Sequence, residues 1–245
     1  MKEMINLSII TVYNDSSKLE NELIKSLDQQ NVEVERIFLD SDKYHFKSAS
    51  EALNYGASQA TKDYFIFAHQ DIVFESKNEV QNIYNKLMSE DAIYGIAGKK
   101  IDQNALYSTI YQGEERVPVN KVSNISNQEE VYCLDECLMA CSRSVYNQIK
   151  FDEVVCNGWD FYVCDFCFQA YLKGIKIYSI ECNIWHTSLG HPKHSFYKTL
   201  KKLTVKYKNK LPVIRTCCIY VKNDFTAPLV IVLKEIRNNL IAKFK

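Results

Sequence analysis

The sequence predicts an α/β protein whose core is a mixed, mostly parallel sheet covered by helices on both faces. Three observations support this fold class. Short apolar runs rich in β-branched and aromatic residues alternate with segments of helical periodicity. A polar cluster follows each of the first three apolar runs, as expected where parallel strands end at one edge. The chain has 245 residues, of which 47% are hydrophobic, so it can bury the core of one large domain.

The alternation is clearest in the first half of the chain. Apolar runs predict four strands, at residues 7–12, 36–40, 64–68 and 92–97. Capping boxes, in which a serine is followed three residues later by a glutamate, predict helices starting at Ser17 and at Ser48. Apolar residues at helical spacing between 80 and 88 predict a third helix.

The second half is less regular. Residues 103–127 are polar and weakly patterned, which predicts a surface flap. Regular structure is expected again at residues 131–139. A helix over residues 161–172 is expected to stop at Gly174, because glycine suits the left-handed backbone found after many helices. A late strand is expected at residues 176–180.

The C-terminal segment is predicted to be a separate extension. Basic residues concentrate from Lys198 onward, and apolar residues recur at helical spacing as far as Phe244. We therefore expect one domain over residues 1–195, with halves 1–100 and 101–195, and a basic, amphipathic helical extension over residues 196–245.

Composition excludes several classes of protein. The formal net charge is zero, so the protein lacks the overall positive field that would predict binding to nucleic acid. We find no secretory signal and no apolar stretch of about 20 residues, so we expect a cytoplasmic protein without a spanning helix. The pair Cys164 and Cys167 lacks a second pair with zinc-ligand spacing. We expect these cysteines to be small buried residues rather than metal ligands.

The polar clusters at residues 13–15, 40–42 and 69–71 are expected to lie together at the carboxyl edge of the sheet. Asp71, in the third cluster, is a candidate metal ligand. A carboxylate cannot hold a nucleotide diphosphate directly, so a divalent cation would have to bridge them. A turn or a helix cap is the alternative role for a single aspartate at this position.

Six short stretches follow one another along the chain in an order that is more specific than any one of them alone. They are residues 8–14, Asp40, residues 54–60, residues 63–71, residues 158–160 and residues 185–188. Together they resemble the family-two glycosyltransferases, which have the GT-A fold, a Rossmann-like arrangement. The resemblance implies transfer of a hexosyl or N-acetylhexosaminyl group, with inversion, from a nucleotide sugar to an acceptor hydroxyl. UDP is the expected nucleotide, and synthesis of cell-surface polysaccharide or glycoconjugate is the expected pathway.

The resemblance also implies roles for individual residues on the donor side. Tyr13 and Asn14 would line the base and ribose pocket, and Asp40 would accept a hydrogen bond from the base. A turn cap is the alternative role for Asp40. The full set of expected donor-binding residues is Thr11, Val12, Tyr13, Asn14, Asp40, Asn54, His69, Gln70 and Asp71.

The metal site departs from the family pattern. Family members carry an Asp-x-Asp motif, whereas this chain has His69-Gln70-Asp71. Asp71 and His186 are the expected ligands of a divalent metal, Mn²⁺ or Mg²⁺, and an imidazole ligand favours Mn²⁺. His69 would either join them or contact the donor.

On the acceptor side, Asp160 is the expected catalytic base, because an inverting transfer needs one carboxylate to take the acceptor proton. Capping of the following helix is the alternative role for Asp160. Trp159 would stack on a sugar face, with a core position as its alternative. Asp135 is expected near the acceptor.

Two alternatives concern partners and activity. The basic amphipathic tail would dock on an anionic membrane carrying a glycan or lipid-linked acceptor, or it would pack on the domain or on a second copy in a homodimer. His69 and Trp159 replace acids of the family, so a catalytically silent nucleotide-sugar-binding or scaffold protein is the alternative to an enzyme.

Overall fold

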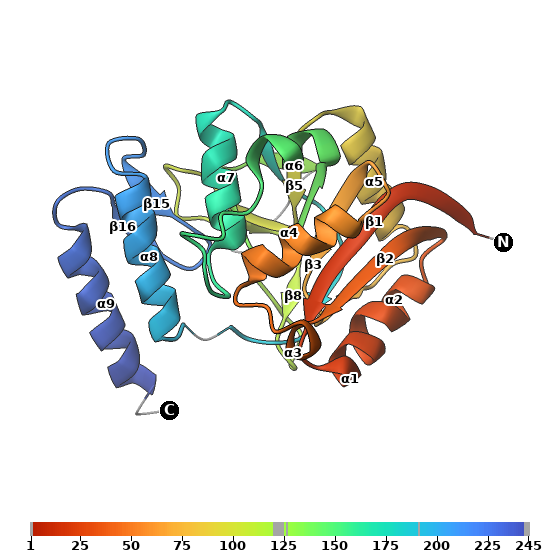
Figure 1. Cartoon of the computed structure of the whole chain (residues 1–245), viewed down its shortest axis with the longest axis horizontal. Coiled ribbons are helices and arrows are strands. Elements are labelled where there is room, and N and C mark those ends of the chain that lie inside the picture. Colours follow the sequence, from red (N-terminus) through yellow and green to blue (C-terminus); the bar gives the residue numbers. More distant parts are fainter. Residues whose placement is uncertain (1, 120–124, 126, 191, 243–245) are drawn as a thin grey trace.

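A computed structural model describes residues 2–119, 125, 127–190 and 192–242. The centre is a seven-stranded mixed sheet of order β10-β13-β5-β12-β3-β1-β2 with helices on both faces (Figure 1). This arrangement confirms the predicted α/β fold class. The strands of this sheet are β1 (Glu3–Tyr13), β2 (Val32–Asp40), β3 (Tyr64–Ala68), β5 (Ile93–Gly95), β12 (Leu138–Ser142), β13 (Ile177–Ile180) and β10 (Gln128–Glu130).

Helices are interspersed with strands along the described part of the chain. They are α1 (Ser16–Lys18), the π-helical η1 (Leu19–Ile24), α2 (Lys25–Asp28), α3 (Ser41–Tyr44), α4 (Ala49–Gln59), α5 (Glu79–Ser89), α6 (Arg143–Ile149), α7 (Tyr162–Leu172), α8 (His194–Lys206) and α9 (Ala227–Ala242). Strands β2, β1 and β3 are parallel neighbours, whereas β12 runs antiparallel to both β3 and β5.

Two hydrophobic cores lie on the two faces of the sheet, because successive side chains of a strand point to opposite sides. Ile10, Phe65 and Phe67 belong to the core beneath α4, α6 and α7. Ile9 and Ile66 belong to the other core, beneath the first helices and α5. Strands buried on both faces read as continuous apolar runs, which is why the sequence located β1 and β3 well.

Two predicted local features need correction, and a third is confirmed. Asp15 caps the first helix by accepting a hydrogen bond from the Lys18 backbone N–H, so the predicted capping box at Ser17 is wrong. Ser48 does cap α4, through a bond from the Glu51 backbone N–H. The predicted strand at residues 92–97 is two strands, because β5 pairs with β12 and β13 while the next strand joins a different sheet.

Three small sheets complete the fold. They are formed by β6 (Ala97–Lys99), β7 (Tyr107–Ser108) and β11 (Cys133–Leu134); by β4 (Ile72–Phe74), β14 (Ile184–His186), β8 (Tyr111–Gln112) and β9 (Val117–Pro118); and by β15 (Val213–Arg215) and β16 (Tyr220–Lys222). The predicted flap at 103–127 thus contains β7, β8 and β9 in its described part, whereas residues 120–124 and 126 lie outside the described residues.

The C-terminal segment packs on the main domain. Leu200 and Leu203 of α8, and Tyr207 directly after it, share the hydrophobic core that lies beneath α7. Helix α9 lies beside α8 at the end of the molecule away from β1 (Figure 1). Residues 243–245, with which the predicted apolar stripe ends, lie outside the described residues. Within the part of the chain that the structure describes, no helix is long and apolar enough to span a membrane.

Candidate functional site

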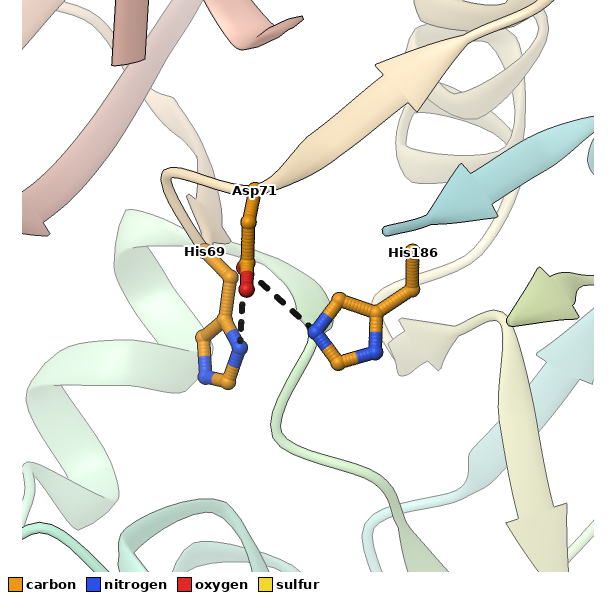
Figure 2. Close-up of side chains that lie close together, drawn as sticks. All are labelled: His69, Asp71 and His186. Atoms are coloured by element: carbon orange, nitrogen blue, oxygen red, sulfur yellow. Dashed lines mark ion pairs between the residues drawn. The ribbon is translucent and has the colours of Figure 1, made fainter. Parts of the chain in front are cut away.

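Three side chains that can bind a metal converge at the carboxyl edge of the sheet (Figure 2). His69 and Asp71 follow β3, and His186 ends β14. Asp71 Oδ1 lies 3.4 Å from His186 Nε2 and 3.7 Å from His69 Nδ1. One potential ligand atom from each residue lies within 4.8 Å of the others, so the group could hold a divalent metal.

Backbone pairing brings His186 to this position from a distant part of the sequence. Strand β14 runs antiparallel to β4, with His186 opposite Ile72, the residue after Asp71. The register continues one residue further, because the Thr187 backbone N–H donates to the Asp71 carbonyl oxygen at 3.0 Å. The Ser188 hydroxyl donates to Asp71 Oδ2, which leaves Oδ1 turned toward the two histidines.

The residues present fit a metal. His186 Nε2 is buried and has no hydrogen-bond partner among the described residues, although it faces the Asp71 carboxylate. A buried ring nitrogen is rarely left unpaired, and ligation would satisfy it. Burial disfavours the charged form of Asp71, but His186, His69 and Ser188 outweigh it and hold the Asp71 pKa well below its usual range. The carboxylate is therefore ionised and ready to bind a cation.

The two histidines differ in protonation. Burial and the neighbouring His186 lower the pKa of His69, so His69 is neutral near pH 7. Burial also opposes the charged form of His186, but the Asp71 carboxylate outweighs burial and raises the His186 pKa. His69 Nε2 lies 2.9 Å from the Tyr162 hydroxyl, which is itself 3.5 Å from the Glu136 carbonyl oxygen. These two successive hydrogen bonds favour the His69 tautomer that carries its proton on Nε2. The lone pair on Nδ1 is then free and faces Asp71.

A cleft of about 500 Å³ connects this group with the expected acceptor residues. The predicted site residues that line it are Val12, Tyr13, Asn14, His69, Gln70, Asp71, Trp159, Asp160 and His186. Residues from the first strand, the β3–β4 loop, the start of α7 and the end of β14 therefore meet at one place. Most of the predicted site residues therefore lie together at the carboxyl edge of the sheet, as expected.

Asp160 lies in this cleft with one side-chain partner, the Ser195 hydroxyl, which donates to Oδ2 at 3.2 Å. Burial raises the Asp160 pKa, against the opposing effects of Ser195 and Lys193. The alternative role as a helix cap is not seen, because Phe161 occupies the cap position of α7 and no side chain caps the helix. Trp159 is 48% exposed and lines the cleft, so it is not a core residue.

The loop after β1 is tied to the metal-binding loop by Gln70. Its amide oxygen accepts from the Asn14 and Asp15 backbone N–H groups at 3.1 and 3.0 Å, and its amide nitrogen donates to Asn14 Oδ1 at 2.8 Å. The Gln70 side chain therefore holds the two loops in register. Asp40, at the end of β2, accepts from the backbone N–H groups of Asp42 and Lys43, so it caps α3.

Four predicted site residues do not line the cleft, and Asp40, which caps α3, is one of them. The side-chain amide of Asn54 is hydrogen-bonded elsewhere. Its nitrogen donates to Phe151 and Glu153, and its oxygen accepts from Tyr146 and Phe151. Thr11 is fully buried within β1. The Asp135 carboxylate accepts from the Cys137 backbone N–H at 3.1 Å.

Sequence reasoning missed several residues of the cleft, and four of them lie beside predicted site residues. Tyr162 contacts His69, Ser188 contacts Asp71, and Lys193 and Ser195 lie beside Asp160. Tyr162 resembles any buried aromatic residue at the start of a helix, so the sequence carries no signal for its role. Ser188 belongs to the stretch 185–188 that carried part of the family resemblance, and that stretch was the available clue.

The cysteines show no metal site in the described part of the chain, where all nine have free thiols. Seven of these thiols are buried, as expected for small core residues. Within the same residues, the group of His69, Asp71 and His186 is the one cluster with metal-ligand geometry.

Comparison with known proteins identifies a family and a shared fold. The sequence matches a glycosyltransferase-like family over residues 8–218. A comparison with curated proteins gave no match. The fold is similar to a fragment of S. aureus TarS in complex with UDP-GlcNAc, with a TM-score of 0.54 at 16% identity over 86% of this chain and 68% of that chain. It is also similar to GalNAc-T7 with UDP, GalNAc and Mn²⁺, with a TM-score of 0.56 at 12% identity over 81% and 47% of the two chains.

At these identities the solved structures establish the shared fold. The family match at residues 8–218 includes most of β1, the start of α7 and the end of β14, which all contribute residues to the cleft. The protein therefore belongs to the glycosyltransferase-like family.

Proposed function

We propose that this protein is a metal-dependent glycosyltransferase that transfers a hexosyl or N-acetylhexosaminyl group from a UDP-linked donor to an acceptor hydroxyl, with inversion. The family supports sugar transfer. Uridine nucleotides are the favoured donors because the two similar solved structures contain UDP or a UDP-sugar. We further propose that residues 1–100 form the donor half, that residues 101–195 form the acceptor half, and that the product belongs to a cell-surface polysaccharide or glycoconjugate.

The observation that carries this proposal is a single cleft that contains both the metal-binding group and Asp160. A divalent cation held by Asp71, His186 and His69 would neutralise the charge that develops on the departing diphosphate. In the same cleft Asp160 is a carboxylate with a raised pKa, caused mainly by burial, and a raised pKa makes it a stronger base near neutral pH.

The proposed reaction is one displacement at the anomeric carbon. Asp160 takes the proton from the acceptor hydroxyl while that oxygen forms its bond to the anomeric carbon and the bond from this carbon to the diphosphate breaks. The Ser195 hydroxyl, at 3.2 Å from Oδ2, orients the carboxylate. The exposed indole of Trp159 offers a flat apolar face to a sugar ring of the acceptor.

Calorimetric titration of UDP, GDP, CDP and dTDP, with and without Mn²⁺, tests the proposal directly. We expect UDP to bind when Mn²⁺ is present, and we expect Asp71→Ala to lose this binding. Asp102→Ala is the matched control, because Asp102 is an exposed aspartate that does not line the cleft. If the wild type binds no nucleotide under either condition, the proposal is wrong. If it binds UDP-sugars but never hydrolyses or transfers them, it is a silent nucleotide-sugar-binding protein.

A further inference from the structure

The inner side of helix α9 contacts the rest of the protein through Val230 and Ile231, which pack on the core, and through polar side chains. Glu235 lies 2.5 Å from His194 Nδ1 and 3.9 Å from Lys201 Nζ, both on α8. Asn238 donates to the Pro192 carbonyl oxygen at 3.1 Å. Ile231 is the one large apolar side chain of α9 that the described structure buries. These contacts therefore fix the inner side of this helix.

The opposite side of α9 is apolar and exposed. Its main side chains are 51–65% exposed, and they are Leu229, Leu233, Ile236 and Leu240. With 3.6 residues per turn, these four form one stripe on the side of the helix away from Ile231 and Asn238. Phe225, just before the helix, is 95% exposed. A surface helix normally turns its apolar side inward, so an outward stripe indicates an apolar partner.

The neighbourhood of this stripe is strongly basic. The chain has eight lysine and arginine residues from 193 to 215 and no aspartate or glutamate there, although its net charge is zero. Lys198 is exposed and lies one turn from both His194 and Lys201, the α8 residues that contact Glu235 of α9. Arg237 adds an exposed positive charge on α9 itself. Arg237 therefore borders the apolar stripe, and further basic side chains lie on the neighbouring helix α8.

We propose that the outward side of α9 docks on the surface of an anionic lipid membrane. The stripe enters the boundary between headgroups and acyl chains, and the neighbouring basic residues contact the headgroups. Helix α9 has 16 residues and lies along the surface rather than crossing the bilayer. A second copy is the less favourable occupant, because a twofold interface would place this basic region against itself. The proposal does not depend on the proposed glycosyl transfer.

Flotation with liposomes tests this docking without any measurement of activity. The full chain is mixed with vesicles of phosphatidylcholine alone, or with 3:7 phosphatidylglycerol and phosphatidylcholine chosen as roughly the charge of an anionic bacterial-type surface. We expect flotation with the anionic vesicles only, and we expect the bound fraction to fall as salt shortens the screening length from about 10 Å at 0.1 M to about 3 Å at 1 M.

Variants separate the two parts of the surface. Leu233→Glu with Ile236→Glu should lower partitioning at least about tenfold, because two apolar side chains no longer enter the lipid. Lys198→Gln leaves the stripe intact and should weaken partitioning by about fivefold, the effect of one basic residue near an anionic surface. Met88→Glu on the distant helix α5 is the matched control, since Met88 is an exposed apolar residue that should not affect flotation.

Three results would overturn the proposal. They are no flotation of the wild type at low salt, equal flotation with neutral and anionic vesicles, and unchanged flotation of the Leu233 and Ile236 double variant. Sedimentation in the absence of lipid identifies the competing occupant. A wild-type dimer that the double variant converts to monomer, without flotation of either protein, would assign the stripe to a second copy of the chain. Thermal unfolding of each variant checks that the fold is retained.

Discussion

Replacement of Tyr162 by phenylalanine is expected to weaken metal binding while the ring stays in place. The substitution removes only the hydroxyl that lies 2.9 Å from His69 Nε2. That hydroxyl holds the proton of His69 on Nε2 and keeps the unprotonated Nδ1 facing Asp71. Loss of a hydrogen bond that orients a metal-binding histidine typically lowers metal affinity about 10- to 100-fold, or about 1.4–2.8 kcal/mol.

The matched control is Tyr146→Phe. Tyr146 is also buried and also donates one hydrogen bond, to Asn54 Oδ1 at 2.7 Å, but it lies outside the cleft. Each variant should lose roughly 0.5–1.5 kcal/mol of unfolding free energy, the usual contribution of one hydrogen bond. Only Tyr162→Phe should change the affinity for Mn²⁺.

Calorimetric titration of Mn²⁺ in the presence of UDP, together with urea unfolding, measures both quantities. A Tyr162→Phe protein that binds Mn²⁺ within twofold of the wild type would refute the argument that Tyr162 positions His69. Equal weakening in both variants would also refute it, because the effect would then follow general stability rather than the orientation of one imidazole.

Three other changes have defined outcomes. Asp160→Asn should reduce sugar transfer by at least about a hundredfold, because the base is lost, and a collapse of UDP affinity in calorimetry would place Asp160 on the donor side instead. Gly56→Ala should cost about 1–3 kcal/mol in urea unfolding, since an added Cβ would lie 2.5 Å from Ile10 Cγ2; an unchanged midpoint would show that the sheet face yields easily. Mn²⁺ affinity should fall as pH drops through the raised pKa of His186, because ligation requires a neutral imidazole; a flat titration between pH 8 and pH 6 would argue against His186 as a ligand.

The sequence predicted the strands that are buried on both faces, because such strands need nothing beyond a continuous apolar run. The sequence-based prediction failed where the pairing of strands in the folded protein sets the strand boundaries. Ile96 lies between two strands because β5 and β6 pair with different partners, and no local pattern reports those partners. The start of the first helix was misplaced because Asp15 and Ser17 are both good caps, and propensity alone does not rank them.

The candidate site was predicted in a similar, uneven way. His69 and Asp71 follow a recognisable strand, and His186 was found from the order of motifs, although its contact with Asp71 depends on the pairing of β14 with β4. Asn54 was expected on the donor side because the family resemblance implies that its helix lies near the donor. Its amide instead satisfies backbone groups at Phe151, a contact between residues 97 positions apart that local patterns do not carry.

The bond between Ser195 and Asp160 has a consequence for how this protein could diversify. The metal-binding group depends on β3, β4 and β14, whereas the side-chain partner of Asp160 comes from α8, in the C-terminal segment. The two ends of the cleft are therefore supported by different stretches of the chain. Exchange of residues around α8 is therefore expected to remodel the Asp160 end of the cleft while the metal-binding end stays intact.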